Sequence, residues 1–320
     1  MTQVHDVYPT RLTDTRSYTE AEWVERRDSV VYSPEPQKYQ GPLSPEQVDF
    51  YDRNGYLFFD SFFSPDEVQP FLDNLKDYEQ DANLKSRDQV IIEPYADEIR
   101  SIFGIHDLSD RFDRLTRDPR LLDIAGQLLD SDVYIHQSRI NYKPGFTGTG
   151  FNWHSDFETW HSEDGMPRMR CFSLSILLTE NNQFNGSLML IPGSHRWFVP
   201  TYGRTPEENW KQSLKSQTLG VPSDDRLHDM AGEGGLVSPT GPSGSVILFE
   251  CNTLHASSNN LSPWPRSNLF FVYNSVENRL QAPYCGTRPR PEFVATRSSV
   301  KPLQRLNSRA ESKQATPLAV

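Results

Sequence analysis

The chain of 320 residues is poor in cysteine, in basic charge and in long apolar segments. Its three cysteines, Cys171, Cys251 and Cys285, lie far apart without a C-x-x-C pair, which argues against a zinc knuckle or a disulfide framework and suits a reducing compartment. The net charge of −11 opposes nucleic-acid binding, which needs a basic face. No run approaches the ~20 apolar residues of a membrane span, and residues 1–20 lack the apolar core of a signal peptide. We therefore expect a cytoplasmic globular protein that has neither nucleic acid nor membrane as a partner.

Three segments before residue 130 carry the start and stop signals of helices. Ser44 followed by proline, with Asn-Gly at the other end, predicts a helix over 44–55, and a strand follows over 56–59. A capping box that begins at Ser64 predicts a second helix to about residue 82. An aspartate cap and apolar residues at helical spacing predict a third over 118–129. We expect these helices to pack as a layer outside a sheet.

After residue 132 the pattern changes to short strands separated by Gly, Pro and Asn turns. The expected strands are 133–143, 151–157, 170–179, 187–191, 245–251 and 268–273. Residues 198–235 are expected to form a long loop with one short helix near Trp210. Many short strands after a helical layer predict a mainly β protein with flanking helices, folded as a double-stranded β-helix, a cupin-like jelly-roll barrel.

The sequence predicts a single domain with two extensions. Residues 1–42 mix charges, tyrosine and proline without periodicity and are expected to form an N-terminal arm. Residues 43–297 form the expected domain, since no internal linker divides them. The polar segment 298–320 is expected to be a disordered tail.

His154 and Asp156 form a His-x-Asp pair within the aromatic stretch 151–167. If this stretch is extended, side chains two residues apart point to the same face, so the imidazole and the carboxylate converge. Completed by a second, distant imidazole, such a pair is the facial triad of non-heme Fe(II) oxygenases. His-x-Asp pairs are also common on solvated loops, so the pair alone is weak evidence for a metal site. Further evidence has to come from the surrounding residues.

His255 is the candidate for the second imidazole. It ends an apolar strand, Ser257 follows two residues later, and Arg266 lies at the start of the next expected strand. An arginine one strand away from a metal-binding histidine can take a carboxylate bidentately. The sequence therefore predicts an iron centre beside a site for a 2-oxo acid that carries a second carboxylate.

These residues, with Gly193-Ser-His195 after an apolar strand, resemble the phytanoyl-CoA dioxygenase superfamily of Fe(II)/2-oxoglutarate oxygenases. The stretch 151–167, continued in 169–181, is similar to the signature of the ectoine hydroxylase family within it. The resemblance spans about 40–297 and implies hydroxylation of ectoine to 5-hydroxyectoine with Fe(II), 2-oxoglutarate and O2, releasing succinate and CO2. It also implies a role in compatible-solute synthesis under osmotic or heat stress, and a homodimer.

Strand alternation tests the binding residues that the resemblance implies. In 133–143 the odd positions Gln137, Arg139, Asn141 and Lys143 share one face, which is either a polar interior or the solvent face of an edge strand. The resemblance assigns Gln137 to ectoine and Asn141 and Lys143 to 2-oxoglutarate. The full expected co-substrate set is Asn141, Lys143, Phe151, Ser257 and Arg266.

The other expected contacts with ectoine come from aromatic residues and an arginine. Phe249 shares strand parity with His255, and Phe270 shares it with Arg266, so both rings are candidates for the pocket wall, although either could be plain core. The indole of Trp160 suits the cationic ring of ectoine. The substrate's carboxylate needs a cation, and the family's spacing favours Arg290 over Arg288. The full expected ectoine set is Gln137, Thr159, Trp160, Phe249, Phe270 and Arg290.

Three other functions compete with this interpretation. A related oxygenase acting on another small or carrier-bound substrate would lack the match over 151–167. A halogenase would need a small residue in place of Asp156. A non-enzymatic metal-binding jelly roll would not need Arg266 and Lys143 turned toward the metal.

Overall fold

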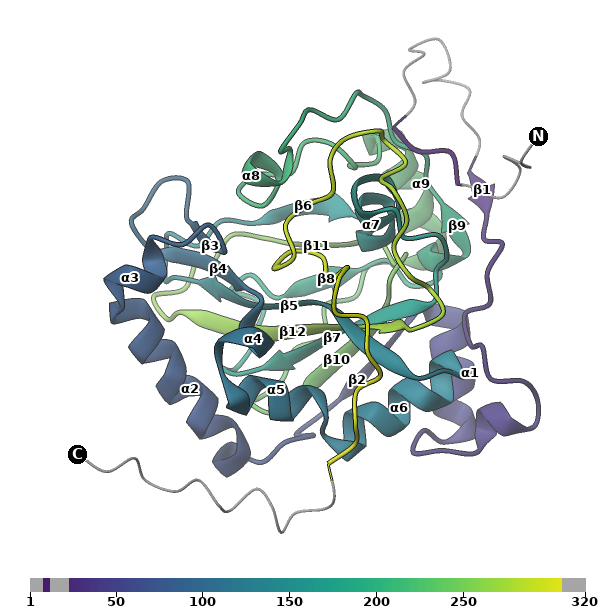
Figure 1. Ribbon diagram of the computed structural model, residues 1–320, viewed down its shortest axis with the longest axis horizontal. Helices are drawn as coiled ribbons and strands as arrows, with labels where there is room; N and C mark the ends of the chain where they lie inside the picture. The colour runs from purple at the N-terminus through teal and green to yellow at the C-terminus, as the bar shows by residue number, and fades with distance from the viewer. Residues whose placement is uncertain (1–7, 12–22, 307–320) are drawn as a thin grey trace.

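In a computed structural model of the chain, residues 8–11 and 23–306 can be described. Two antiparallel sheets face each other, and helices cover the outer face of the larger one (Figure 1). The large sheet has the order β2 (Tyr56–Phe59), β10 (Val246–Glu250), β7 (Cys171–Leu177), β12 (Arg266–Ser275), β5 (Val133–Lys143), β4 (Ile99–Phe103) and β3 (Val90–Ile92). The small sheet has the order β6 (Phe151–His154), β11 (His255–Ser257) and β8 (Leu188–Leu190). β1 (Val24–Glu25) and β9 (Trp197–Phe198) form a separate pair.

The predicted double-stranded β-helix is confirmed, with one correction to its shape. Leu188 and Leu190 of the small sheet pack against Ile247, Phe249 and Phe270 of the large sheet, as expected for the interior of a jelly roll. The two sheets share no strand pairing in the described part of the chain, so they do not close into a barrel.

The predicted helical layer lies on the outer face of the large sheet (Figure 1). It contains α1 (Pro45–Asn54), α2 (Pro65–Gln80) and α6 (Pro119–Leu129), which match the three predicted helices to within two residues at each end. Ser44 and Gln47 form a capping box at the start of α1, and Gly55 ends the helix with a φ of 76°. Other elements that we did not predict are the helices α3 (Ala82–Lys85), α4 (Ile105–Leu108) and α5 (Asp110–Thr116), and the strands β3 and β4 of the large sheet.

The predicted strand over 151–157 is wrong after His154. Ser155 leaves the strand and caps α7 (Asp156–Asp164), because its Oγ accepts a hydrogen bond from the backbone N–H of Glu158 at 3.3 Å. Asp156 is therefore the first residue of a helix. The remaining predicted strands are present, whereas β11 was missed because its three residues are too few to show alternation.

Two boundaries also differ from the prediction. The segment 198–235 contains α8 (Trp210–Ser213), as expected, and also α9 (Asp224–Gly234), whose single buried residue, Met230, gives only a weak helical pattern. The tail does not leave the domain at 298, since the backbone N–H of Leu303 donates to the carbonyl of Val133 at 2.9 Å. The rest of the predicted disordered tail, 307–320, lies outside the described residues. Two 3-10 turns, η2 (Gln37–Tyr39) and η3 (Ser194–Arg196), complete the described helices.

The predicted N-terminal arm packs against the domain where it can be described. Tyr8 and Arg11 are both buried, and Arg11 forms ion pairs with Glu158 and Glu163 of α7. Across residues 8–11 and 23–306, every helix is too short or too polar to cross a bilayer.

Candidate active site

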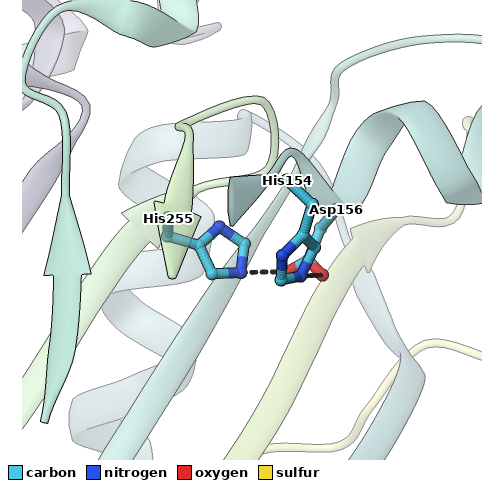
Figure 2. Close-up of side chains that lie close together, drawn as sticks. All are labelled: His154, Asp156 and His255. Atoms are coloured by element: carbon cyan, nitrogen blue, oxygen red, sulfur yellow. Dashed lines mark ion pairs between the residues drawn. The ribbon is translucent and has the colours of Figure 1, made fainter. Parts of the chain in front are cut away.

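His154, Asp156 and His255 meet where β6 passes into α7 beside β11 (Figure 2). His154 ends β6 and is the register partner of His255, the first residue of β11. The Nε2 atom of His154 lies 3.8 Å from Oδ1 of Asp156, and Nε2 of His255 lies 3.9 Å from Oδ2. The three side chains can offer ligand atoms that all lie within 4.8 Å of one another. The predicted convergence is thus present, although a strand-to-helix junction produces it instead of an extended strand.

The backbone and Ser173 fix the orientation of these side chains. Nδ1 of His154 lies 2.7 Å from the carbonyl oxygen of Asn152, and Nδ1 of His255 lies 2.9 Å from that of Thr253. A carbonyl can only accept, so each Nδ1 carries the proton and each Nε2 has its lone pair free for a metal. The hydroxyl of Ser173 donates to Oδ2 of Asp156 at 3.0 Å.

The protonation states also suit a divalent metal ion. Burial, followed by the nearby His255, lowers the pKa of His154 to about 4, and burial also lowers the pKa of His255. Burial alone would raise the pKa of Asp156, but His255 and Arg139 outweigh it and hold that pKa below its ordinary value. Two neutral imidazoles and one carboxylate fit Fe(II) and leave coordination positions for other ligands.

A cavity opens from the triad toward a cationic end formed by Arg266, and Lys143 is hydrogen-bonded to the lining residue Ser257. Arg266 lines the cavity and is only 4% exposed; its Nη2 donates to the carbonyl of Gly186, while its Nε has no partner in the described structure. Lys143 donates from Nζ to Oγ of Ser257 at 3.0 Å and to the carbonyl of Ser258. Arg266 forms no ion pair within the described part of the chain, so this end of the cavity is suited to an anion.

The sequence pattern of the family described as phytanoyl-CoA dioxygenase (PhyH) matches residues 51–268, which include the triad and Arg266. The chain belongs to the phytanoyl-CoA dioxygenase family.

Individual relatives resemble the chain over most of its length. An ectoine dioxygenase of Bordetella bronchiseptica is 50% identical over 89% of this chain and 92% of its own. Another, of Halomonas elongata, is 50% identical over 91% of this chain and 86% of its own. The crystal structure of EctD from S. alaskensis with 2-oxoglutarate and 5-hydroxyectoine has a TM-score of 0.80 and 44% identity, covering 93% of this chain and 98% of that one. The structure of the same protein with bound Fe gives the same TM-score and identity, over 94% and 98%.

In this member of the family, strand β5 presents its polar face to the cavity. Gln137, Arg139 and Asn141 line the cavity, and Lys143 is buried behind Ser257. Because β5 is hydrogen-bonded to β12 on one side and to β4 on the other, it is not an edge strand, and the solvent-face alternative is wrong. A register shift in the pairing between β12 and β5 leaves His136 without a register partner on β12, so the alternation of the two strand faces is interrupted just before Gln137.

The expected co-substrate residues lie around the cationic end. Asn141, Phe151, Ser257 and Arg266 line the cavity. The ring of Phe151 is covered by the guanidinium of Arg100, whose Cζ lies 3.8 Å from the ring centroid. Arg100 was not predicted; its partner Glu93 belongs to a part of the sequence that carried no recognised motif.

Five of the six residues expected to contact ectoine line the cavity, namely Gln137, Thr159, Trp160, Phe270 and Arg290. Phe249 does not line it; its ring packs against the imidazole of His255, with centroids 4.9 Å apart, so it supports that side chain instead. Arg288 is exposed, whereas Arg290 is buried.

Several residues in or next to the cavity were not predicted from the sequence, or were given no role. Leu214 and Gln217, from the segment 198–235, line the cavity. Arg139 was placed on the correct face without being assigned a role. Asp164 was missed because it stands 126 residues from Arg290, which it binds through Oδ1 and Oδ2 at 2.7 and 2.5 Å.

Proposed function

We propose that this chain is an ectoine dioxygenase, which converts ectoine to 5-hydroxyectoine with Fe(II), 2-oxoglutarate and O2 and releases succinate and CO2. One observation carries the proposal: the buried His154, Asp156 and His255 open onto a single cavity that ends in Arg266. The names of the most similar relatives, and the ligands in the EctD structure, support ectoine as the substrate.

His154, Asp156 and His255 would hold the iron. Fe(II), when bound, supplies the redox chemistry that couples oxidative decarboxylation of 2-oxoglutarate to insertion of one oxygen atom of O2 into a C–H bond. The chain positions the reactants: Arg266, Lys143 and Ser257 would hold the far carboxylate of 2-oxoglutarate, with Asn141 and Phe151 beside it. The oxygen chemistry itself belongs to the metal centre.

The ectoine-binding part of the cavity lies beside α7 and is partly aromatic. The indole of Trp160 is fixed edge-to-face against His136, with ring centroids 5.1 Å apart, and would offer its surface to the delocalised cation of ectoine. Phe270 forms a second wall. Leu214 and Gln217 also line the cavity and would help to exclude water during the reaction.

Succinate release tests the function and separates it from the alternatives. The Fe(II)-reconstituted protein should form succinate from 2-oxoglutarate much faster with ectoine than without it. An Asp156→Ala variant should form none and should lose most of its Fe(II) affinity, because a three-ligand site cannot spare a ligand. Succinate formation that does not respond to ectoine would indicate another substrate, and no formation at all would favour a non-enzymatic metal-binding protein.

We also propose that the chain acts as a homodimer in the cytoplasm. Phe146, Phe184, Leu261 and Trp264 are exposed large apolar residues on loops that hydrogen-bond to one another. These loops, 144–151, 181–187 and 256–265, carry no charged residue in a chain of net charge −11, so two copies would repel each other least through this face. The three free thiols suit a reducing compartment.

A further inference from the structure

Phe151 borders the cavity and also a second hollow, a groove formed by residues 92–95, 149–152, 212–216 and 257–259. The groove has a volume of about 780 Å³ and is open to solvent, since Asn152, Lys215 and Ser258 in its wall are exposed. In the described part of the chain, Phe151 and Ser257 are the residues that line both hollows. These two side chains therefore form the partition between the cavity and the groove.

The partition lies at the opposite end of strand β6 from the triad. In the pairing of β6 with β11, His154 is the register partner of His255, and Phe151 is the register partner of Ser257. Three residues of strand, about 10 Å, therefore separate the metal end of the cavity from the partition.

The same partition lies next to the cationic end of the cavity. In the large sheet, Arg266 is the register partner of Lys143. Nζ of Lys143 donates to Oγ of Ser257 at 3.0 Å and lies 6.0 Å from the ring centroid of Phe151. The ring of Phe151 thus stands where the far carboxylate of a bound 2-oxoglutarate would end.

Arg100 holds this ring in place. It is only 1% exposed, and its Cζ lies 3.8 Å from the ring centroid of Phe151. Nη1 forms an ion pair with Glu93 at 3.3 Å, and Nε donates to the carbonyl of Leu214 at 3.3 Å. Because the guanidinium is bound at both ends, its plane is fixed against the ring.

The backbone on the N-terminal side of Phe151 is fixed as well. The carbonyl of Gly150 accepts a hydrogen bond from Nη2 of Arg100 at 2.8 Å, and its N–H donates to Oδ1 of Asn259 at 2.7 Å. A Cβ at Gly150 would lie 2.6 Å from the carbonyl oxygen of Ser257, so the close approach of the two chains requires glycine. With its backbone and its ring both held, Phe151 forms a rigid wall.

We propose that Phe151, positioned by Arg100, is the specificity-determining residue that limits the co-substrate to a 2-oxo diacid of five carbons. One more methylene would move the far carboxylate past Arg266 and into the ring. A smaller side chain at this position would join the cavity to the groove and provide the missing space. This inference rests on the proposed function and names the residue that selects its co-substrate.

The test compares 2-oxoglutarate with 2-oxoadipate, which has one more methylene. Calorimetry measures the binding of each acid to the anaerobic Fe(II) protein, and the preference is the ratio of the two dissociation constants. The wild type should prefer 2-oxoglutarate by at least about tenfold, and Phe151→Ala by less than about threefold, since a closed pocket discriminates one methylene by about 10- to 200-fold. With ectoine and O2, Phe151→Ala should also convert 2-oxoadipate to glutarate and CO2 while it hydroxylates ectoine.

Phe103 provides the matched control, because it lines the cavity but not the groove. Phe103→Ala should keep the wild-type preference, since the space that it creates does not open the partition. If Phe151→Ala does not fold, Phe151→Val serves with the same expected loss. A preference that survives in the Phe151 variant, or one that is lost equally in Phe103→Ala, would overturn the inference.

Arg100→Lys tests the positioning role, because lysine keeps the charge beside Glu93 but has no planar group to cover the ring. It should lower the preference at least about threefold in the wild type and have no further effect in Phe151→Ala, as expected for residues that act through one contact. Equal effects in both backgrounds would overturn the role of Arg100.

The wild-type measurement separates the inference from the proposed function. A wild type that binds both acids equally well would overturn the inference alone. A wild type that does not bind 2-oxoglutarate would refute the proposed function, and the inference with it.

Discussion

Arg266 lines the cavity and is proposed to bind 2-oxoglutarate, and its Nε has no hydrogen-bond partner in the described structure. Arg266→Ala should raise the 2-oxoglutarate concentration needed for half-maximal succinate formation by at least about thirtyfold, since loss of a partner for a desolvated carboxylate costs about 2–5 kcal/mol. The ectoine requirement should change less than about threefold. The exposed Arg288→Ala serves as the control. A shift confined to ectoine would remove Arg266 from the co-substrate site.

The lowered pKa of Lys143 predicts that the affinity for 2-oxoglutarate depends on pH. Burial, followed by the charges of Arg266 and Arg100, lowers the pKa of Lys143 to about 6, so its amine is mostly neutral at pH 7.5 in the free protein. A bound dicarboxylate favours the ammonium and raises this pKa. The protonated form therefore binds more tightly, and the affinity for 2-oxoglutarate should increase as the pH falls from 8 toward about 6.

Calorimetry in buffers of different ionisation enthalpy measures the linked protons. Binding of 2-oxoglutarate to the wild type at pH 7.5 should take up close to one proton. Lys143→Met should bind more weakly and take up almost none. Equal proton uptake in the two proteins would show that another group is responsible.

For single residues, the sequence predicts which face of a strand a side chain occupies better than it predicts which other side chain it contacts. Alternation along β5 placed Gln137, Arg139 and Asn141 correctly, because these residues lie on one regular strand. Alternation could not reveal the ion pair between Asp164 and Arg290, which depends on tertiary packing. Phe249 has the parity of a cavity residue, but the imidazole of His255 covers its ring.

Helix α7 is the element that decides the site, because it begins with Asp156 and contains Thr159 and Trp160. The N-terminal segment holds it: Arg11 forms ion pairs with Glu158 at 2.8 Å and with Glu163 at 3.0 Å, all three side chains being almost fully buried. Arg11→Met would leave two buried carboxylates without their cation. We expect the free energy of unfolding at pH 7.5 to fall by about 3–5 kcal/mol.

Denaturant unfolding followed by circular dichroism measures this change. Arg305→Met, which breaks an exposed pair with Asp123, is the control and should have little effect. Adding Glu158→Gln to Arg11→Met should recover part of the loss. An Arg11→Met variant as stable as the wild type would mean that the N-terminal segment does not support α7.

The error over 151–157 has a local cause. The aromatic residues of that stretch favour a strand. However, the hydroxyl of Ser155 accepts a hydrogen bond from the backbone N–H of Glu158, and a helix starts there. The helices of the outer layer were predictable because each begins with a cap and buries one face. Short elements such as β11 and the weakly amphipathic α9 carry too little pattern to be recognised.

For the whole molecule, the uncharged loop surface predicts the mode of association. Trp264 is 70% exposed and lies on a loop whose neighbour Ser262 accepts a backbone hydrogen bond from Phe146 at 3.0 Å. Trp264→Lys should convert the proposed dimer to a monomer in light scattering, because it would place a charge in the centre of the proposed apolar interface. Leu236→Lys, at an exposed apolar residue outside these loops, should leave the dimer intact. A dimer that persists in Trp264→Lys would place the interface elsewhere.

The most direct test of the central claim follows the oxygen atoms. Anaerobic protein is loaded with Fe(II), 2-oxoglutarate and ectoine, exposed to 18O2, and its products are analysed by mass spectrometry. The account predicts ectoine that has gained one 18O atom at carbon 5 and succinate that has gained the other, in equal amounts, and neither product with Asp156→Ala. Succinate formed while ectoine stays unlabelled and unconsumed would contradict it.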